Sequence, residues 1–206
     1  MLQVHMLTSL HEDRLNIVVG ALKDNSARRV LDLGCGSGPL LLALAANPFF
    51  EQIVGLDISR EALAACTRNL AQAGLDAGER VRILNDTFAE PNPDFAGFDA
   101  AVLLETIEHI PPDRLSKVER AVFRSFRPGL VLITTPNQDC NELLGVPAHR
   151  LRHPGHEFEW SREKFEAWAT GVASRNGYGV SFAGIGLSHP VLGSPSQMAL
   201  FTEGEA

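Results

Sequence analysis

The sequence has no apolar run long enough to cross a membrane and no segment typical of a secretory leader. Residues 1–20 contain scattered His, Asp, Glu and Arg side chains instead of a basic stretch followed by an apolar one. Cysteine is also scarce, and Cys35, Cys66 and Cys140 show no paired spacing. These absences argue against a membrane protein and a disulfide scaffold. They predict a cytoplasmic protein with reduced thiols.

Basic residues are fewer than acidic ones: the chain has 18 Lys and Arg and 25 Asp and Glu, which gives a formal net charge of -7. This balance disfavours a partner held by diffuse electrostatics, such as long duplex DNA. Recognition of one nucleic-acid end stays compatible with it, since a few arginines in a local patch suffice. Basic residues recur between Arg114 and Arg127 at helical spacing, and others gather between His149 and His153. The alternative for the basic residues between Arg114 and Arg127 is that they form the solvent-exposed face of a helix.

No repeat, low-complexity tract or linker divides the chain, so we expect a single domain over residues 1–206. Short β-rich runs alternate with helical stretches, which is typical of βαβ units around a parallel sheet. The last two strands are expected to form an antiparallel ribbon at the sheet edge. The expected helices are Leu10–Lys23, Pro39–Ala46, Ser59–Ala73, Asp113–Phe126 and Ser161–Ala173. The expected strands are Arg29–Leu33, Gln52–Asp57, Arg80–Asn85, Asp99–Leu104, Leu130–Thr135, Gly179–Leu187 and Gln197–Thr202.

A glycine-rich turn, Asp32-Leu33-Gly34-Cys35-Gly36-Ser37-Gly38, follows the first expected strand and precedes the next helix. Glycine lets the backbone approach a ligand closely at such a turn. The second strand ends in Asp57, where a carboxylate can accept hydrogen bonds from both hydroxyls of a ribose. The turn alone would be ordinary turn chemistry, but together with Asp57 it predicts a ligand pocket.

This pattern resembles the class I S-adenosylmethionine-dependent methyltransferases more than the dehydrogenases, because the third glycine follows the second by two residues. The resemblance implies a Rossmann-like α/β fold. Its mostly parallel seven-stranded sheet would have a terminal antiparallel strand and helices on both faces. The implied cofactor-binding residues are Asp32, Gly34, Cys35, Gly36, Asp57 and Asp86, with Asp57 at the ribose and Asp86 near the adenine.

Glu105, Glu108 and His109 follow the fourth expected strand at positions i, i+3 and i+4. If one helical turn follows that strand, their side chains leave the same face. Two carboxylates and an imidazole that converge there are typical of a metal site or an acid–base cluster. The alternative is a helix N-terminus whose glutamates only complement the helix dipole. His156, in a basic loop, would alone be taken for a surface histidine.

The second half of the chain narrows the family. Its Glu-x-x-Glu-His element at 105–109, Thr134–Asn137, and its His-x-Phe-Glu-Trp element at 156–160 resemble the catalytic domain of the Hen1 small-RNA 3′-terminal 2′-O-methyltransferases. The resemblance runs from about Leu10 to Phe201. It implies a divalent metal, Mg²⁺ or Mn²⁺, that holds the 2′ and 3′ hydroxyls of the terminal ribose. The implied ligands and catalytic residues are Glu105, Glu108, His109 and His156.

The same resemblance predicts an enzyme that methylates the 2′-hydroxyl at an RNA 3′ end, with one histidine accepting the proton. Thr135 and Asn137 are candidates for lining the substrate, and Arg152 for a bidentate phosphate contact. An RNA-repair or small-RNA-pathway protein is the expected partner. Gly155 stands where many members have an acid, which bears on the metal geometry or the RNA contact. Two alternatives stay open: a small-molecule acceptor, and a non-catalytic RNA-end-binding subunit.

Overall fold

The computed structural model describes residues 2–75 and 78–204, with side chains from Leu10 onward. Every predicted strand is present, with ends that move by two residues at most. The helices are α1 (Leu2–Asp24), α2 (Pro39–Ala45), α3 (Arg60–Gln72), α4 (Leu115–Arg120) and α5 (Arg162–Asn176). The strands are β1 (Arg29–Leu33), β2 (Gln52–Asp57), β3 (Val81–Asn85), β4 (Ala100–Leu104), β5 (Leu130–Pro136), β6 (Tyr178–Ile185) and β7 (Ser196–Glu203).

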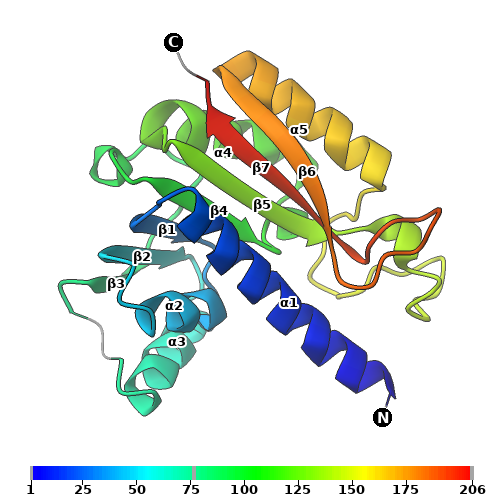
Figure 1. The fold of residues 1–206 in the computed structure, drawn as a ribbon, viewed down its shortest axis with the longest axis horizontal. Coiled ribbons are helices and arrows are strands. Elements are labelled where there is room, and N and C mark those ends of the chain that lie inside the picture. The colour runs from blue at the N-terminus through cyan, green and yellow to red at the C-terminus, as the bar shows by residue number, and fades with distance from the viewer. Residues whose placement is uncertain (1, 76–77, 205–206) are drawn as a thin grey trace.

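The strands form one seven-stranded sheet with the order β3-β2-β1-β4-β5-β7-β6 (Figure 1). The first five strands are parallel, and β7 pairs antiparallel with both β5 and β6. The predicted architecture and the antiparallel ribbon beside β5 are therefore confirmed. Because parallel strands share one direction, the carboxyl ends of β1, β2, β4 and β5 meet at one edge, where such sheets bind ligands.

Two helical segments differ from the prediction. Helix α1 begins at Leu2 instead of Leu10, since residues 2–9 contain no glycine or proline that would end it. The predicted helix Asp113–Phe126 is divided into a 3₁₀ turn, α4 and a π-type segment, Ala121–Phe126. That wider segment buries its phenylalanines. No helix in the described part of the chain combines the length and apolar character needed to cross a bilayer.

Apolar layers on both faces hold the helices to the sheet. One layer packs α4 and α5 against the strands, and the other packs α1, α2 and α3 against them. Strands buried on both faces have nearly continuous apolar runs, which is why the sequence predicts a strand over Asp99–Leu104, one residue longer than β4. The largest buried side chains of the two layers include Phe123, Phe126, Phe165 and Phe201 on one face and Phe50, Leu40 and Leu41 on the other.

Asp32, in β1, is an acidic residue inside this apolar sheet. Its side chain is 2 % exposed, and Oδ2 has no hydrogen-bond partner among the described residues. Burial, together with the nearby Cys66 and Asp57, raises the pKa of Asp32 to about 8. A buried charge without a partner destabilises a fold, so the native state favours the protonated acid.

We predict that Asp32→Asn gains stability relative to the wild type as the pH rises from about 4 to 8. The native pKa lies above the unfolded value, so between these pH values the native state holds a proton that the unfolded state has lost. The wild type therefore loses stability on the order of 1.4 kcal/mol per pH unit from this group, and the neutral amide does not. Urea unfolding at both pH values measures the difference. A stability difference that does not change with pH would contradict the prediction.

Candidate functional site

The glycine-rich turn after β1 has a backbone conformation that residues with side chains rarely adopt. Gly34, Gly36 and Gly38 have φ angles of 83°, 56° and 85°. A Cβ atom on Gly34 would lie 2.4 Å from Cγ2 of Thr106, and one on Gly38 would lie 2.3 Å from Sγ of Cys66. A Cβ atom on Gly36 would meet nothing within 4 Å. Packing thus requires two of the glycines, whereas the third faces open space that a ligand can enter.

Asp57, at the end of β2, holds this turn in place. Its Oδ2 accepts a hydrogen bond from the N–H of Gly36 at 2.9 Å, and its Oδ1 accepts one from the N–H of Ser59 at 2.8 Å. Each carboxylate oxygen has a second lone pair, which stays available to ligand hydroxyls. The predicted ribose-binding acid therefore also fixes the loop that would bind the rest of the cofactor.

A cavity of about 820 Å³ opens beside this turn. Its size lies within the range of about 300–1,000 Å³ that is common for cofactor sites. Four of the six predicted cofactor residues line it, but Asp32 is buried behind it, and Asp86 turns its Oδ1 to the N–H of Thr87 at 2.7 Å. Thr87 and Phe88 line the cavity in place of Asp86. Their position just after β3, at the ligand-binding edge, is the signal that could have identified them.

Glu105, directly after β4, has a φ angle of 51°, which is uncommon for a residue other than glycine. The expected helical turn is therefore incomplete, and a 3₁₀ turn begins only at Ile107. Both oxygens of the Glu105 carboxylate are engaged. Nη2 of Arg14 lies 3.2 Å from Oε2, and the hydroxyl of Ser196 donates to Oε1 at 2.8 Å. Glu105 also lines the cofactor cavity, as does His109.

Glu108 is a completely buried carboxylate with one unused oxygen. Its Oε2 accepts a hydrogen bond from the Thr135 hydroxyl at 3.0 Å, and Oε1 has no partner among the described residues. Burial, and next the charge of Glu105, raise the pKa of Glu108 well above its usual range. Such a group is stable only when it is protonated or pairs with a cation. Glu108 thus offers a carboxylate oxygen that is free to bind a positive ion.

His109 and His156 leave the same ring nitrogen free. Nδ1 of His109 lies 2.9 Å from the carbonyl oxygen of Gly155, and Nδ1 of His156 lies 2.6 Å from Oε1 of Glu159. Because both partners accept, Nδ1 carries the proton in each neutral ring, and Nε2 keeps its lone pair. Metal-binding histidines commonly have this arrangement. Burial lowers the pKa of His109, with further lowering from the other two histidines nearby, and so favours the neutral ring.

Glu159 is the carboxylate behind His156, and its side chain is fully buried. It also accepts hydrogen bonds from Nδ2 of Asn141 at 2.6 Å and from the N–H of Arg152 at 2.7 Å. Burial opposes ionisation, but these donors and the Arg152 charge outweigh it and lower the pKa of Glu159. A charged acceptor therefore fixes the His156 ring.

The three predicted substrate residues make internal contacts. Arg152 donates from Nε to Oδ1 of Asn141 at 2.6 Å, from Nη1 to the Pro195 carbonyl at 2.7 Å, and from Nη2 to the Asn137 carbonyl. Thr135 and Asn137 are buried at 0 % and 1 % exposure. None of the three lines the cavity beside the glycine-rich turn, and a role for them toward RNA stays a prediction.

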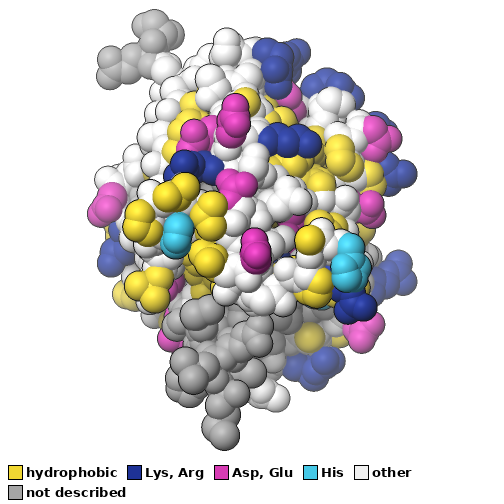
Figure 2. All heavy atoms as spheres, turned by 90° about the vertical axis from the view of Figure 1, so that its right-hand side faces the viewer, with side chains coloured by type: hydrophobic (Ala, Val, Ile, Leu, Met, Phe, Trp, Pro, Cys, Tyr) yellow, Lys and Arg dark blue, Asp and Glu magenta, His cyan; other side chains and the backbone are white. Residues whose placement is uncertain are grey.

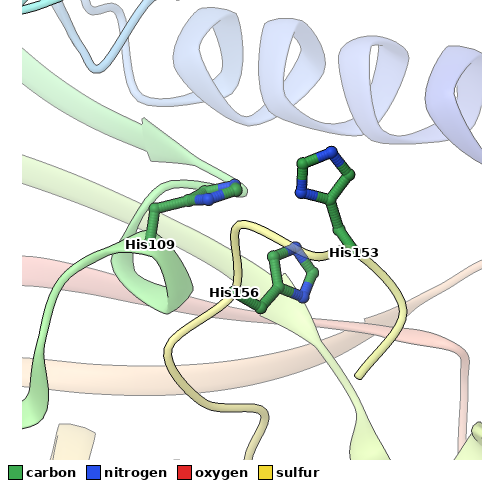
Figure 3. Close-up of side chains that lie close together, drawn as sticks. All are labelled: His109, His153 and His156. Carbon is green, nitrogen blue, oxygen red and sulfur yellow. The ribbon is translucent and has the colours of Figure 1, made fainter. Parts of the chain in front are cut away.

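The structure brings three imidazoles together. One nitrogen from each of His109, His153 and His156 lies within 4.8 Å of the others. Figure 3 shows the rings converging from the turn after β4 and from the loop before α5. Sequence spacing gave no sign of His153, which looks like any other residue of the basic cluster. The fold, not the sequence pattern, reveals its position.

By the chemistry of their donor atoms, the four ligands predicted from the sequence suit a divalent cation, whereas the cluster that the structure holds within 4.8 Å consists of His109, His153 and His156. Glu108 supplies a buried oxygen without a partner, Glu105 a second carboxylate, and His109 and His156 two imidazole nitrogens. A mixed set of oxygen and imidazole ligands suits Mg²⁺, Mn²⁺ or a similar ion better than a structural zinc site.

The surface near the site has no dominant charge. Figure 2 shows basic, acidic and histidine side chains interspersed with an apolar patch. Leu143 and Leu187, which are 55 % and 88 % exposed, border a cavity of about 350 Å³ beside His189. Such a surface suits local contacts better than a long stretch of nucleic-acid backbone.

Comparisons with known proteins connect this geometry to a family. The family model described as a methyltransferase domain matches residues 30–129. The small RNA 2′-O-methyltransferase of Mus musculus is 33 % identical over 94 % of this chain and 51 % of its own length. That of Arabidopsis thaliana is 30 % identical over 93 % of this chain and 22 % of its own. The chain thus spans about half or less of these relatives.

Solved structures give a fuller match. The methyltransferase domain of the bacterial protein CtHen1 is 38 % identical with a TM-score of 0.86, covering 95 % of this chain and 100 % of that one. The small RNA methyltransferase HEN1 is 32 % identical, also with a TM-score of 0.86, over 95 % of this chain and 25 % of that one. Identity and fold therefore agree over nearly all of the sequence, and the chain belongs to the Hen1 family of small RNA 2′-O-methyltransferases as a class I methyltransferase domain.

Proposed function

We propose that this chain transfers a methyl group from S-adenosylmethionine to the 2′-hydroxyl of the 3′-terminal nucleotide of RNA. A divalent metal would be held by Glu105, Glu108, His109 and His156. The observation that carries the proposal is the unpartnered Oε1 of Glu108, close in sequence to a histidine that lines the cofactor cavity. The relatives named above, which are small RNA 2′-O-methyltransferases, support the choice of acceptor.

The cofactor supplies an electrophilic methyl group, and the metal supplies charge that lowers the pKa of a hydroxyl and fixes its direction. The protein's part is to orient both. Gly36 leaves the space for close approach, and Asp57 offers lone pairs to ribose hydroxyls. Glu159 holds Nδ1 of His156, which leaves Nε2 of that ring free for a metal that would bind there. Positioning of this kind is worth several orders of magnitude in rate.

The proton of the attacking hydroxyl needs an acceptor. A histidine that binds a metal through Nε2 and donates from Nδ1 to Gly155 or Glu159 has no lone pair left. The expected role of a histidine as base therefore applies only to a ring that is not a ligand. Carboxylate oxygens of Glu105 or Glu108, or water, would accept the proton when both rings are bound.

The acidic net charge and the mixed surface favour contacts confined to an RNA end. We propose an RNA-repair or small-RNA-pathway protein as the partner that supplies further affinity for RNA. One chain of the solved Pnkp1/Rnl/Hen1 RNA repair complex shares the fold, at 20 % identity and a TM-score of 0.68.

We predict metal-dependent methylation of a short RNA with a free 3′-terminal diol. Labelled S-adenosylmethionine would be supplied with Mn²⁺ or Mg²⁺, and in parallel with a chelator. A matched RNA that ends in 2′-deoxyribose has no 2′-hydroxyl and should receive no label. Labelling that is equal with the chelator, or equal on the deoxy RNA, would refute the proposed reaction. Labelling only of small molecules would favour the alternative acceptor.

We also predict that Glu159→Gln weakens Mn²⁺ binding by about 10- to 100-fold, which is typical when a carboxylate behind a metal-binding histidine is lost. The amide of Gln has one oxygen and cannot accept hydrogen bonds from Asn141, Arg152 and His156 together, as the carboxylate does. The His156 ring therefore loses its fixed orientation. Titration of Mn²⁺ by electron paramagnetic resonance measures this without RNA. Glu157→Gln, an exposed change two residues away, is the matched control and should bind as the wild type does. Equal affinity of both variants would remove Glu159 from the metal site.

A further inference from the structure

His153 gives the chain a second, nitrogen-rich way to bind a metal. We propose that His109, His153 and His156 form a site for an ion such as Zn²⁺, which overlaps the Mg²⁺ or Mn²⁺ site and excludes the other ion. The two sites share His109 and His156. They differ in their remaining ligands, which are Glu105 and Glu108 in one and His153 in the other.

The rings are near enough for this. Their centroids lie 4.8 Å apart for His109 and His156, 5.5 Å for His153 and His156, and 5.7 Å for His109 and His153. Tetrahedral zinc with ligands at 2.0–2.1 Å needs nitrogens about 3.3 Å apart. One nitrogen of each ring already lies within 4.8 Å of the others, so these three nitrogens must close by about 1.5 Å at most, and a ring that presents its other nitrogen must also turn. His153 and its neighbours Pro154 and Gly155 are exposed, so this movement disturbs no core packing.

Gly155 leaves room for that approach. A Cβ atom at this position would lie 3.1 Å from Nδ1 of His153 and 3.4 Å from Nδ1 of His109. A side chain there would stand between the two rings. Glycine at position 155 thus has a structural consequence: it allows the third imidazole to come near.

His153 differs from the other two rings in its hydrogen bond. Its Nδ1 accepts from the N–H of Gly155 at 3.0 Å, so the neutral ring carries its proton on Nε2. To bind a metal through Nδ1, the ring must give up this bond, and to bind through Nε2 it must also change tautomer. That loss is small beside a metal–imidazole bond. His109 and His156 are therefore poised at all times, whereas His153 becomes a ligand only for an ion that favours a third nitrogen.

The chemistry of the donors separates the ions. Carboxylates suit Mg²⁺ and Mn²⁺, and imidazole suits zinc, copper and nickel. Four-coordinate zinc with three imidazoles keeps one open position, whereas two ribose hydroxyls need two. The zinc form would then be inactive. This last consequence rests on the proposed function, but the binding site itself does not.

The test uses the full chain, stripped of metal by a chelator, without RNA or cofactor. Zn²⁺ affinity is measured by competition with a chromophoric indicator, and Mn²⁺ affinity by electron paramagnetic resonance. Co²⁺ reports the ligand number, because four-coordinate Co²⁺ absorbs visible light much more strongly than six-coordinate Co²⁺. The variants are His153→Ala and His153→Asn, the second of which keeps an acceptor near the position of Nδ1 for the Gly155 N–H. His149→Ala, an exposed change in the same loop, is the matched control.

We expect both His153 variants to weaken Zn²⁺ binding by at least about 10- to 100-fold, since even partners behind a ligand contribute that much. They should lose the strong Co²⁺ absorption and keep the Mn²⁺ affinity of the wild type. His149→Ala should change none of these. Unchanged Zn²⁺ affinity in the His153 variants, or an equal loss of Zn²⁺ and Mn²⁺, would overturn the proposal. Because no RNA is present, failure of RNA methylation would leave this result unaffected.

Discussion

One buried carboxylate holds the loop between β5 and α5 in place. Glu159 accepts hydrogen bonds from His156, from Asn141 and from the main chain of Arg152. Arg152 then reaches the carbonyls of Asn137 and Pro195, at the ends of this loop and of the one before β7. Residues 141–159, all described by the structure, form no strand or α-helix, so this loop is held by a connected polar network together with the buried Phe158 and Trp160 side chains. Such networks are strong when every member is satisfied and fail together when one is removed.

The parallel sheet could be predicted because its strands are apolar throughout and are separated by clear turns. The conformation of Glu105 could not, since its contacts come from Arg14 and Ser196, which are distant in the sequence. His153 was missed for the same reason: only the fold brings it to His109. The prediction identified Arg152 as an important side chain but did not find its partners, because sequence spacing does not distinguish an internal hydrogen bond from a phosphate contact.

Among the described residues, two buried carboxylate oxygens have no hydrogen-bond partner, one near the cofactor cavity and one among the predicted metal ligands. Asp32 lies behind the cofactor cavity, and Glu108 lies among the predicted metal ligands. Both groups have raised pKa values, and burial is the main cause in each. Neither arrangement favours the stability of the isolated fold. Buried groups of this kind are retained where a ligand completes them, so the sheet edge combines low local stability with binding capacity.

Strand β7 lies between β5 and β6, and its first residue, Ser196, donates a hydrogen bond to Glu105. The ribosome therefore synthesises last, among the seven strands, one that lies inside the sheet and not at its edge. Until residues 196–203 have emerged, β5 has an open edge and Glu105 lacks one of its two supports. Pairing over such long sequence separations is slow, and unpaired edges attract other chains. The catalytic edge should thus be among the last parts of a newly made chain to become ordered.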